Sequence, residues 1–250
     1  MAIIHASHRG IAEEKMRAVL TLIAFAALSM QAAPKPNVVL ILADDLGWGD
    51  VSCYQPGNRF QTPEIDRIAR EGLRMTNAHA PHSVCSPTRY AVLTGRYCWR
   101  TFLREGVLPG YAKPLIAKRR MTLASLLKQR GYATGAFGKW HIGMGWTPVK
   151  GDPGDFHYGS QIHASGSALA AISRRVNHAA PISGGPTDLG FDTFFGTPSN
   201  RGRIPVFIRD NRVVGSPLRN KSGLMQDPAM RADTVDDLYA EEAVRFIEKA

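Results

Sequence analysis

An uninterrupted apolar run, residues 37–43 (NVVLILA), constrains the fold of this 250-residue chain more than any other segment. Aliphatic runs without polar alternation are typical of strands buried on both faces, as in parallel sheets covered by helices. The run ends at Asp44 and Asp45. Ligands of open α/β sheets gather beyond the carboxyl ends of the strands, so these two acids are predicted to lie in a site.

Helical segments alternate with short apolar runs after this point. Capping residues mark the helices: Thr62 and Thr122 as N-caps, and Gly95 as a stop. We predict helices over residues 62–72, 87–95 and 122–131 and strands over residues 73–78 and 132–137. The alternation predicts an α/β sandwich, in which helices flank a mainly parallel or mixed central sheet.

Two later regions differ in character. Residues 143–202 are rich in Gly, Pro, Ser and His, which predicts a rim of loops, with His157, His163 and His178 at the surface. Residues 234–250 predict an amphipathic helix. Its apolar stripe would consist of Val235, Leu238, Tyr239, Ala243, Phe246 and Ile247.

The amino-terminal segment has the layout of a secretory signal peptide. An uncharged run, residues 18–30, follows Lys15 and Arg17 and precedes small residues. A bilayer needs about 20 apolar residues, so this shorter run favours cleavage over stable membrane insertion. We therefore predict that residues 1–33 are an extension plus signal peptide, with Met16 an alternative start to Met1, and that the mature protein is secreted or periplasmic.

The charge balance favours an anionic partner. Lys and Arg number 31 against 21 for Asp and Glu, which gives a formal net charge of +10. The basic residues are scattered apart from residues 118–120, without interleaved aromatic residues or zinc-finger spacing, so nucleic acid is not the expected partner. Three cysteines cannot all pair within one chain, and whether Cys53 and Cys98 form a disulfide stays open.

Cys85 opens the segment CSPTR, which combines several features of a reactive site. A cysteine just before a proline-started helix lies at the positive end of the helix dipole, where an anion is stabilised. Arg89 returns to the same face one turn later and can reach a bound oxyanion. Asp44 and Asp45 add the hard oxygen donors that Ca²⁺ or Mg²⁺ prefer.

Lys139 and His141 lie in a third cluster, residues 138–143 (GKWHIG), directly after a predicted strand. Positions two apart share a face in an extended stretch, so both side chains are predicted to face one pocket while Trp140 packs the other way. Lysine offers a point charge for an oxyanion, and histidine can carry a proton near neutral pH.

Together these segments resemble the signature blocks of the sulfatase family, especially its arylsulfatase-like members. The resemblance rests on residues 36–50, 85–89 with 94–96, and 138–143, in matching order and spacing, and residues 190–196 (GFDTFFG) resemble a further block. It extends over residues 35–250. It implies the alkaline-phosphatase-like form of the α/β sandwich, here truncated: residues 34–250 would be the amino-terminal part of the catalytic domain. The remaining metal ligands, histidine and lysine would lie beyond residue 250, so residues 1–250 alone are expected to be inactive.

The resemblance also implies a chemistry for Cys85. A maturation enzyme would oxidise it to formylglycine, whose hydrated aldehyde attacks the sulfur of a sulfate ester. Ca²⁺, or alternatively Mg²⁺, would be bound by Asp44, Asp45 and the modified Cys85. The substrate would be a sulfated small molecule or glycan.

The remaining roles follow from the same resemblance. Arg89 would steady the nucleophile, Lys139 would bridge nucleophile and sulfate, and His141 would act as the base and contact the substrate with Lys139. Three alternatives stay open: a phosphate or phosphonate ester hydrolase of the same superfamily, an inactive anion-binding relative, and a thiol hydrolase that uses Cys85 with His141.

Overall fold

The computed structural model describes residues 19, 35–55, 57–151, 166–200 and 202–250. The chain divides into two compact units, Met1–Ala43 and Asp44–Ala250, and the second holds all the candidate site residues. The predicted signal peptide, apart from Val19, lies outside the described residues, as do His157 and His163.

The apolar run at residues 37–43 does not form a strand, so this prediction is wrong for the structure. Its side chains are exposed, 66% for Val39 and 81% for Ile41. A doubly buried strand needs neighbours that bond its main-chain groups and helices that cover its side chains.

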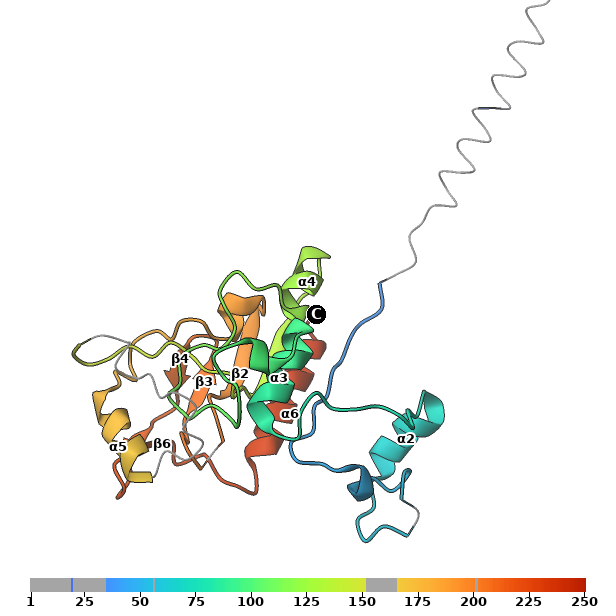
Figure 1. Ribbon diagram of the computed structural model, residues 1–250, viewed down its shortest axis with the longest axis horizontal. Helices are drawn as coiled ribbons and strands as arrows, with labels where there is room; N and C mark the ends of the chain where they lie inside the picture. The colour runs from blue at the N-terminus through green and yellow to red at the C-terminus, as the bar shows by residue number, and fades with distance from the viewer. Residues whose placement is uncertain (1–18, 20–34, 56, 152–165, 201) are drawn as a thin grey trace, which may run out of the picture. The chain divides into compact units, whose positions relative to one another are not determined.

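The second unit is built on a four-stranded mixed sheet, which confirms the α/β class (Figure 1). The strands are β1 (Gly135–Lys139), β2 (Thr193–Thr197), β3 (Phe207–Arg209) and β4 (Arg212–Val214), in the order β1-β2-β3-β4. β1 and β2 are parallel, whereas β3 pairs antiparallel with both β2 and β4. A separate hairpin joins β5 (Leu218–Arg219) to β6 (Met225–Gln226). The strand predicted at residues 132–137 corresponds to β1, which begins and ends later in the chain, at Gly135 and Lys139.

Consecutive side chains of β2 point to opposite faces of the sheet. A hydrophobic cluster covers each face. Phe194 belongs to the large core, which also includes Trp140 and Ile208. Phe195 belongs to a second cluster with Phe207 and Val235. This arrangement is the sandwich that the sequence predicts.

The second cluster lies between the sheet and α6 (Val235–Ile247), the predicted carboxyl-terminal helix. α6 contacts β1 and β2. Its predicted stripe is used in this contact: Val235 is buried, and the ring of Phe246 lies 5.7 Å from that of Phe137. An ion pair of 2.9 Å between Glu242 and Arg209 also joins α6 to β3.

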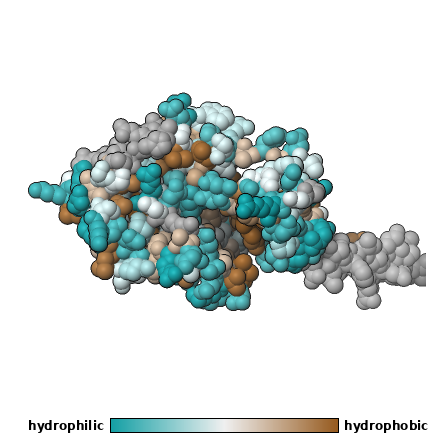
Figure 2. All heavy atoms as spheres, turned by 90° about the horizontal axis from the view of Figure 1, so that it is seen from below, coloured by the Kyte–Doolittle hydropathy of each residue, from teal (hydrophilic) through white to brown (hydrophobic). Residues whose placement is uncertain are grey.

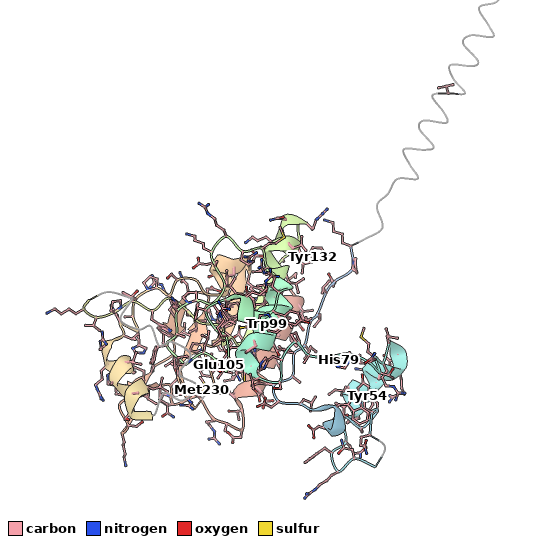
Figure 3. All side chains as sticks on the ribbon, in the orientation of Figure 1. Tyr54, His79, Trp99, Glu105, Tyr132 and Met230 are labelled. Carbon is pink, nitrogen blue, oxygen red and sulfur yellow. The ribbon has the colours of Figure 1, made fainter. Side chains whose placement is uncertain are left out.

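Local capping signals predicted the helices well. α3 (Cys85–Thr94) starts two residues earlier than expected and ends at Gly95, whose φ of 64° is left-handed. α4 (Leu123–Gln129) begins after Thr122, whose hydroxyl accepts a 3.0 Å hydrogen bond from the Ser125 N–H. Short 3₁₀ turns η1 (Trp48–Asp50) and η2 (Cys98–Arg100) complete this region, and Trp99 of η2 lies beside α3 (Figure 3).

α2 (Pro63–Glu71) forms where Pro63 and Gly72 predict it, but its apolar face is uncovered. Ile68 is 60% exposed. The Thr62 hydroxyl bonds Ser52 and Asp66 instead of capping the helix. The strand predicted at residues 73–78 is wrong, since this stretch is irregular and held by single contacts such as that of the Tyr54 hydroxyl with the Met75 carbonyl oxygen (2.9 Å; Tyr54 is labelled in Figure 3).

The predicted loop rim at residues 143–202 contains regular structure, which corrects that expectation. It includes α5 (Gly166–Arg175), the 3₁₀ turn η4 (Pro186–Leu189) and β2. His178 is half-buried rather than at the surface, because its Nε2 lies 3.0 Å from the Tyr111 hydroxyl and its ring packs against Trp146.

Three further features concern the surface, membrane-spanning segments and the cysteines. On the face in Figure 2, apolar residues reach the surface in separate places rather than as one patch. Within the described residues, no helix is long and apolar enough to span a membrane. The thiols of Cys53, Cys85 and Cys98 are all free, so the structure contains no Cys53–Cys98 disulfide.

Candidate active site

Cys85 is the first residue of α3 and is half-buried. The N–H groups and dipole of a helix amino terminus favour negative charge at this position. Arg89 follows one turn later with its side chain only 13% exposed. α3 therefore presents a sulfur atom and a guanidinium on one face, as the sequence predicts.

Lys139, the last residue of β1, brings a second cation to Cys85. Its Nζ lies 3.1 Å from the Cys85 Sγ and 2.6 Å from Oδ2 of Asp44. Its side chain is 14% exposed, so water screens these contacts weakly. The end of β1 and the start of α3 thus meet at the sulfur atom.

Asp44 connects both cations. Its Oδ1 accepts a hydrogen bond of 3.2 Å from Nη2 of Arg89 in addition to the contact with Lys139. Partial burial would raise the pKa of Asp44, but the charges of Lys139 and Arg89 outweigh it and hold the pKa below its ordinary value. The carboxylate is therefore ionised at neutral pH.

Arg89 also bonds the main chain. Its Nη1 donates to the carbonyl oxygen of Lys139, which fixes α3 against the end of β1. Its Nε is buried and, in the part of the chain that the structure describes, has no hydrogen-bond partner. A buried cationic N–H donor without a partner, close to the ammonium of Lys139, fits an oxyanion that the site would receive.

The fit of a metal ion follows from the donor set. Ligand atoms of Asp44, Asp45 and Cys85 lie within 4.8 Å of one another. The φ of Asp45 is 61°, a left-handed conformation that non-glycine residues adopt mainly at special positions. Carboxylate oxygens suit Ca²⁺ or Mg²⁺, whereas a thiolate sulfur is a softer ligand. The acid pair therefore fits a hard cation, and Cys85 would fit it better with oxygen in place of sulfur.

His141 does not share one extended face with Lys139. Its φ of 56° ends the alternation of β1, and the ring is buried, with Nε2 2.9 Å from the Leu108 carbonyl oxygen. Trp140 points into the core, as expected. Burial first, and then the charges of Lys139 and Arg89, lower the pKa of His141 to about 4. The imidazole is neutral at pH 7.

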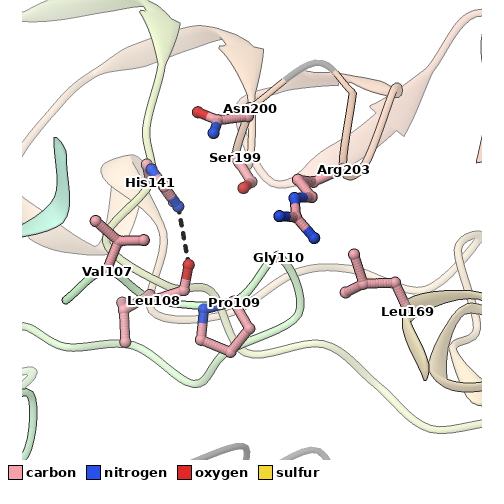
Figure 4. A pocket seen from close by; sticks show the side chains of 9 residues that line it. All are labelled: Val107, Leu108, Pro109, Gly110, His141, Leu169, Ser199, Asn200 and Arg203. Carbon is pink, nitrogen blue, oxygen red and sulfur yellow. Dashed lines mark hydrogen bonds between the residues drawn. The ribbon is translucent and has the colours of Figure 1, made fainter. Parts of the chain in front are cut away.

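A small cavity of about 50 Å³ lies beside His141 (Figure 4). Ser199, Asn200 and Arg203 line it opposite Leu108. Within the described chain, the buried Oγ of Ser199 has no hydrogen-bond partner. No sequence motif marks these three residues. Their place in the chain could have indicated them, because they follow the carboxyl end of β2, the strand parallel to β1.

The decisive comparison is with models of protein families. The model described as Sulfatase matches residues 36–249, which is most of the chain. The chain belongs to the sulfatase family. The resemblance of the signature segments is thereby confirmed.

Curated sulfatases share substantial identity with it. N-acetylgalactosamine-6-O-sulfatase of Bacteroides thetaiotaomicron is 38% identical over 186 residues, which cover 74% of this chain and 31% of that protein. Human arylsulfatase A is 43% identical over 131 residues (52% and 25%). Mouse arylsulfatase G is 41% identical over 238 residues (92% and 41%). This sulfatase chain thus spans between a quarter and two fifths of the length of these relatives.

Solved structures agree on the fold. A Bacteroides thetaiotaomicron structure, described under the metabolism of multiple glycosaminoglycans, aligns with a TM-score of 0.67 at 28% identity, over 87% of this chain and 48% of that one. A sulfatase from Pseudoalteromonas sp. aligns with a TM-score of 0.55 at 26% identity, over 95% and 45%. The α/β sandwich is therefore that of sulfatases.

Proposed function

We propose that the whole protein is a sulfuric ester hydrolase whose nucleophile derives from Cys85. The carrying observation is the contact of Lys139 Nζ with both Cys85 Sγ (3.1 Å) and Asp44 Oδ2 (2.6 Å). An ammonium between the nucleophile position and an acid can hold the anionic oxygens of a sulfate ester directly over the nucleophile.

The site residues have separate tasks in this proposal. Asp44 and Asp45, with an oxygen derived from Cys85, hold Ca²⁺ or Mg²⁺, which supplies positive charge to the nucleophile and the sulfate oxygens. Oxidation of Cys85 to formylglycine by a maturation enzyme replaces its soft sulfur with an oxygen nucleophile, the hydrated aldehyde.

Cations and a base perform the remaining work. Arg89 lies on the same face of α3 as Cys85, so its positive charge steadies the nucleophile. Lys139 binds the developing negative charge of the sulfate. His141 is neutral and can therefore accept a proton. Bringing these groups together ahead of the reaction avoids the cost of ordering them in the transition state.

An assay with paired substrates tests the activity. The whole protein is incubated with an aryl sulfate and the matching aryl phosphate, and kcat/KM is compared. We expect a higher value for the sulfate, loss of activity with a strong chelator, and its return with Ca²⁺. A higher kcat/KM for the phosphate would reject the proposal in favour of a phosphate ester hydrolase.

Mass spectrometry tests the origin of the nucleophile. The peptide that contains Cys85 should carry formylglycine, which is lighter than cysteine, and Cys85→Ala should be inactive. An active protein with a wholly unmodified thiol, inactivated by alkylating reagents, would support the thiol mechanism with His141 instead. An unmodified and inactive protein would support the anion-binding relative.

A sulfated glycan is the substrate class that we propose. The named action of the Bacteroides relative on N-acetylgalactosamine-6-sulfate and the net charge of +10 support it. The test compares release of sulfate from sulfated N-acetylgalactosamine, a sulfated polysaccharide and an aryl sulfate. Turnover of the aryl sulfate alone would contradict the glycan assignment.

Export is the third part of the proposal, and the uncharged run at residues 18–30 supports it. We expect the mature protein outside the cytoplasm, without residues 1–33. Amino-terminal sequencing of the protein recovered from the periplasm or medium checks this. A cytoplasmic protein that retains the segment would contradict it.

A further inference from the structure

Ser86 is the residue of the CSPTR segment that lies between Cys85 and Pro87, and its side chain is fully buried. Its Oγ accepts a 3.1 Å hydrogen bond from the N–H of Leu108, which is 22 residues away in the chain. A buried hydroxyl that bonds a distant main-chain N–H fixes that segment in place. Ser86 thus ties the first turn of α3 to Leu108.

Leu108 passes this constraint on to His141. Its carbonyl oxygen lies 2.9 Å from the Nε2 of His141, as the dashed line in Figure 4 marks. The Leu108 side chain is buried, and Pro109 restricts the backbone of the residue before it. With the N–H held by Ser86, the direction of this carbonyl has little freedom.

The contact determines the tautomer of His141. A carbonyl oxygen only accepts hydrogen bonds, so Nε2 must carry the proton, and a neutral imidazole then has its lone pair on Nδ1. That Nδ1 is buried and has no hydrogen-bond partner among the described residues. A buried acceptor without a partner fits a group that acts on a bound molecule.

We propose that Ser86 is a positioning residue that, through the main chain of Leu108, holds His141 as the Nε2–H tautomer with Nδ1 ready to take up a proton. The inference rests on the proposed sulfatase activity, in which His141 is the base. The O–H bond of a hydroxyl on the hydrated aldehyde breaks, its proton bonds to Nδ1 and its electron pair stays on the oxygen. The proton later passes from Nδ1 to water, so His141 returns to its starting state. Position 86, next to Cys85, thereby couples the nucleophile segment to the base.

Nuclear magnetic resonance tests the geometry independently of activity. The whole protein is labelled with ¹⁵N-histidine, and the His141 signals are assigned by their loss in His141→Asn. We expect the Nε2–H tautomer in the natural protein and in Ser86→Thr, which keeps a hydroxyl. In Ser86→Ala we expect a mixture of tautomers.

Ser173→Ala is the matched control. Ser173 is also fully buried and its Oγ accepts a hydrogen bond from a main-chain N–H, that of Met225 at 3.3 Å. We expect the His141 signals to be unchanged in this variant. An Nδ1–H tautomer in the natural protein, or an unchanged tautomer in Ser86→Ala, would overturn the inference, and the first result needs no variant to fold.

A double-mutant cycle tests the catalytic consequence. We expect Ser86→Ala to lower kcat by about tenfold, the low end for groups that orient active-site ligands. Rates are expressed per converted Cys85, measured by mass spectrometry, so that incomplete maturation does not count as lost positioning. The same substitution should have almost no effect in a His141→Ala background.

The outcomes separate the two proposals. An equal loss in both backgrounds would show that Ser86 acts elsewhere and would overturn the inference. Absence of sulfatase activity in the natural protein, together with the expected tautomers, would reject the proposed function while the positioning by Ser86 stands.

Discussion

Nη2 of Arg89 lies 3.2 Å from Oδ1 of Asp44, across 45 residues of chain. The same guanidinium bonds the carbonyl oxygen of Lys139. Arg89 therefore joins three segments that are far apart in the sequence: the residues before η1, the first turns of α3 and the end of β1.

Replacement of Arg89 tests this junction. A single ammonium cannot reproduce two separate bonds of a planar guanidinium, so Arg89→Lys should lower kcat/KM by roughly a hundredfold. Arg67→Lys is the control, since Arg67 makes an exposed 3.0 Å pair with Glu64 on α2. Steady-state kinetics with an aryl sulfate would contradict the prediction if both variants kept natural activity.

Asp45 provides a test of metal binding. Asp45→Asn removes one negative charge from the acid pair, so the concentration of Ca²⁺ needed for half-maximal activity should rise at least about tenfold. The exposed Asp237 on α6 is the control position, and Asp237→Asn should not change it. Metal titration of the chelated protein measures both. An unchanged titration of the Asp45 variant would exclude this residue from the metal site.

Gly143 provides a test of stability. Its φ is 79°, and a Cβ there would lie 2.0 Å from the carbonyl oxygen of Lys113, so Gly143→Ala should lower the free energy of unfolding by about 3 kcal/mol. At Gly166, the first residue of α5, a Cβ meets nothing within 4 Å. Gly166→Ala should therefore leave thermal unfolding nearly unchanged, and equal effects of both changes would refute the steric explanation.

His178 provides a test of pH dependence. Burial, then the charge of Arg219, lowers its pKa to about 4, whereas an unfolded histidine titrates near 6.5. Between these values the unfolded chain binds a proton that the folded chain does not, so stability falls as pH drops from about 6.5 to 4. The loss should be of the order of 2 kcal/mol, allowing for solvent screening.

The control for this prediction is the same chain without the titrating ring. His178→Gln should lower the melting temperature at pH 8, because the variant loses the contact with the Tyr111 hydroxyl. Near pH 4 the melting temperatures of the variant and the natural protein should lie closer together. Thermal unfolding at several pH values measures this, and parallel curves for the two proteins would refute it.

Local signals predicted more than long-range ones. Thr122 and Gly95 set helix boundaries through bonds and backbone angles within a few residues, so the sequence contains what the helices need. Strands depend on partners. Residues 37–43 have strong strand character but do not form a strand in the structure, whereas β2 forms from only five residues because β1 and β3 pair with it.

The sequence also contains a hairpin signal. Asp210 and Asn211 form the two-residue connection between β3 and β4, where Arg209 pairs with Arg212. Asp210 has a φ of 56°, the left-handed conformation that such turns require and that Asp and Asn tolerate. The dipeptide lies between Arg209 and Arg212, and the β-branched Ile208 and Val213 pair one residue further out, so it predicts the turn once these flanking residues are read as strands.

The site divides in the same way. The signature segments predicted that Asp44, Asp45, Cys85, Arg89 and Lys139 share one site, and these residues lie together in the structure. The orientation of His141 could not be foreseen, because it depends on a left-handed residue after β1 and on the main-chain oxygen of Leu108, which no side-chain pattern encodes.

The bond from Arg89 to residue 139 ends on a main-chain oxygen, while the ammonium of that same residue contacts the sulfur of Cys85. Any amino acid at position 139 supplies the oxygen, but only lysine or a close substitute supplies the charge. Architecture and electrostatics at this position can therefore be altered one at a time, which makes residue 139 a clean place to measure what a single positive charge contributes to the site.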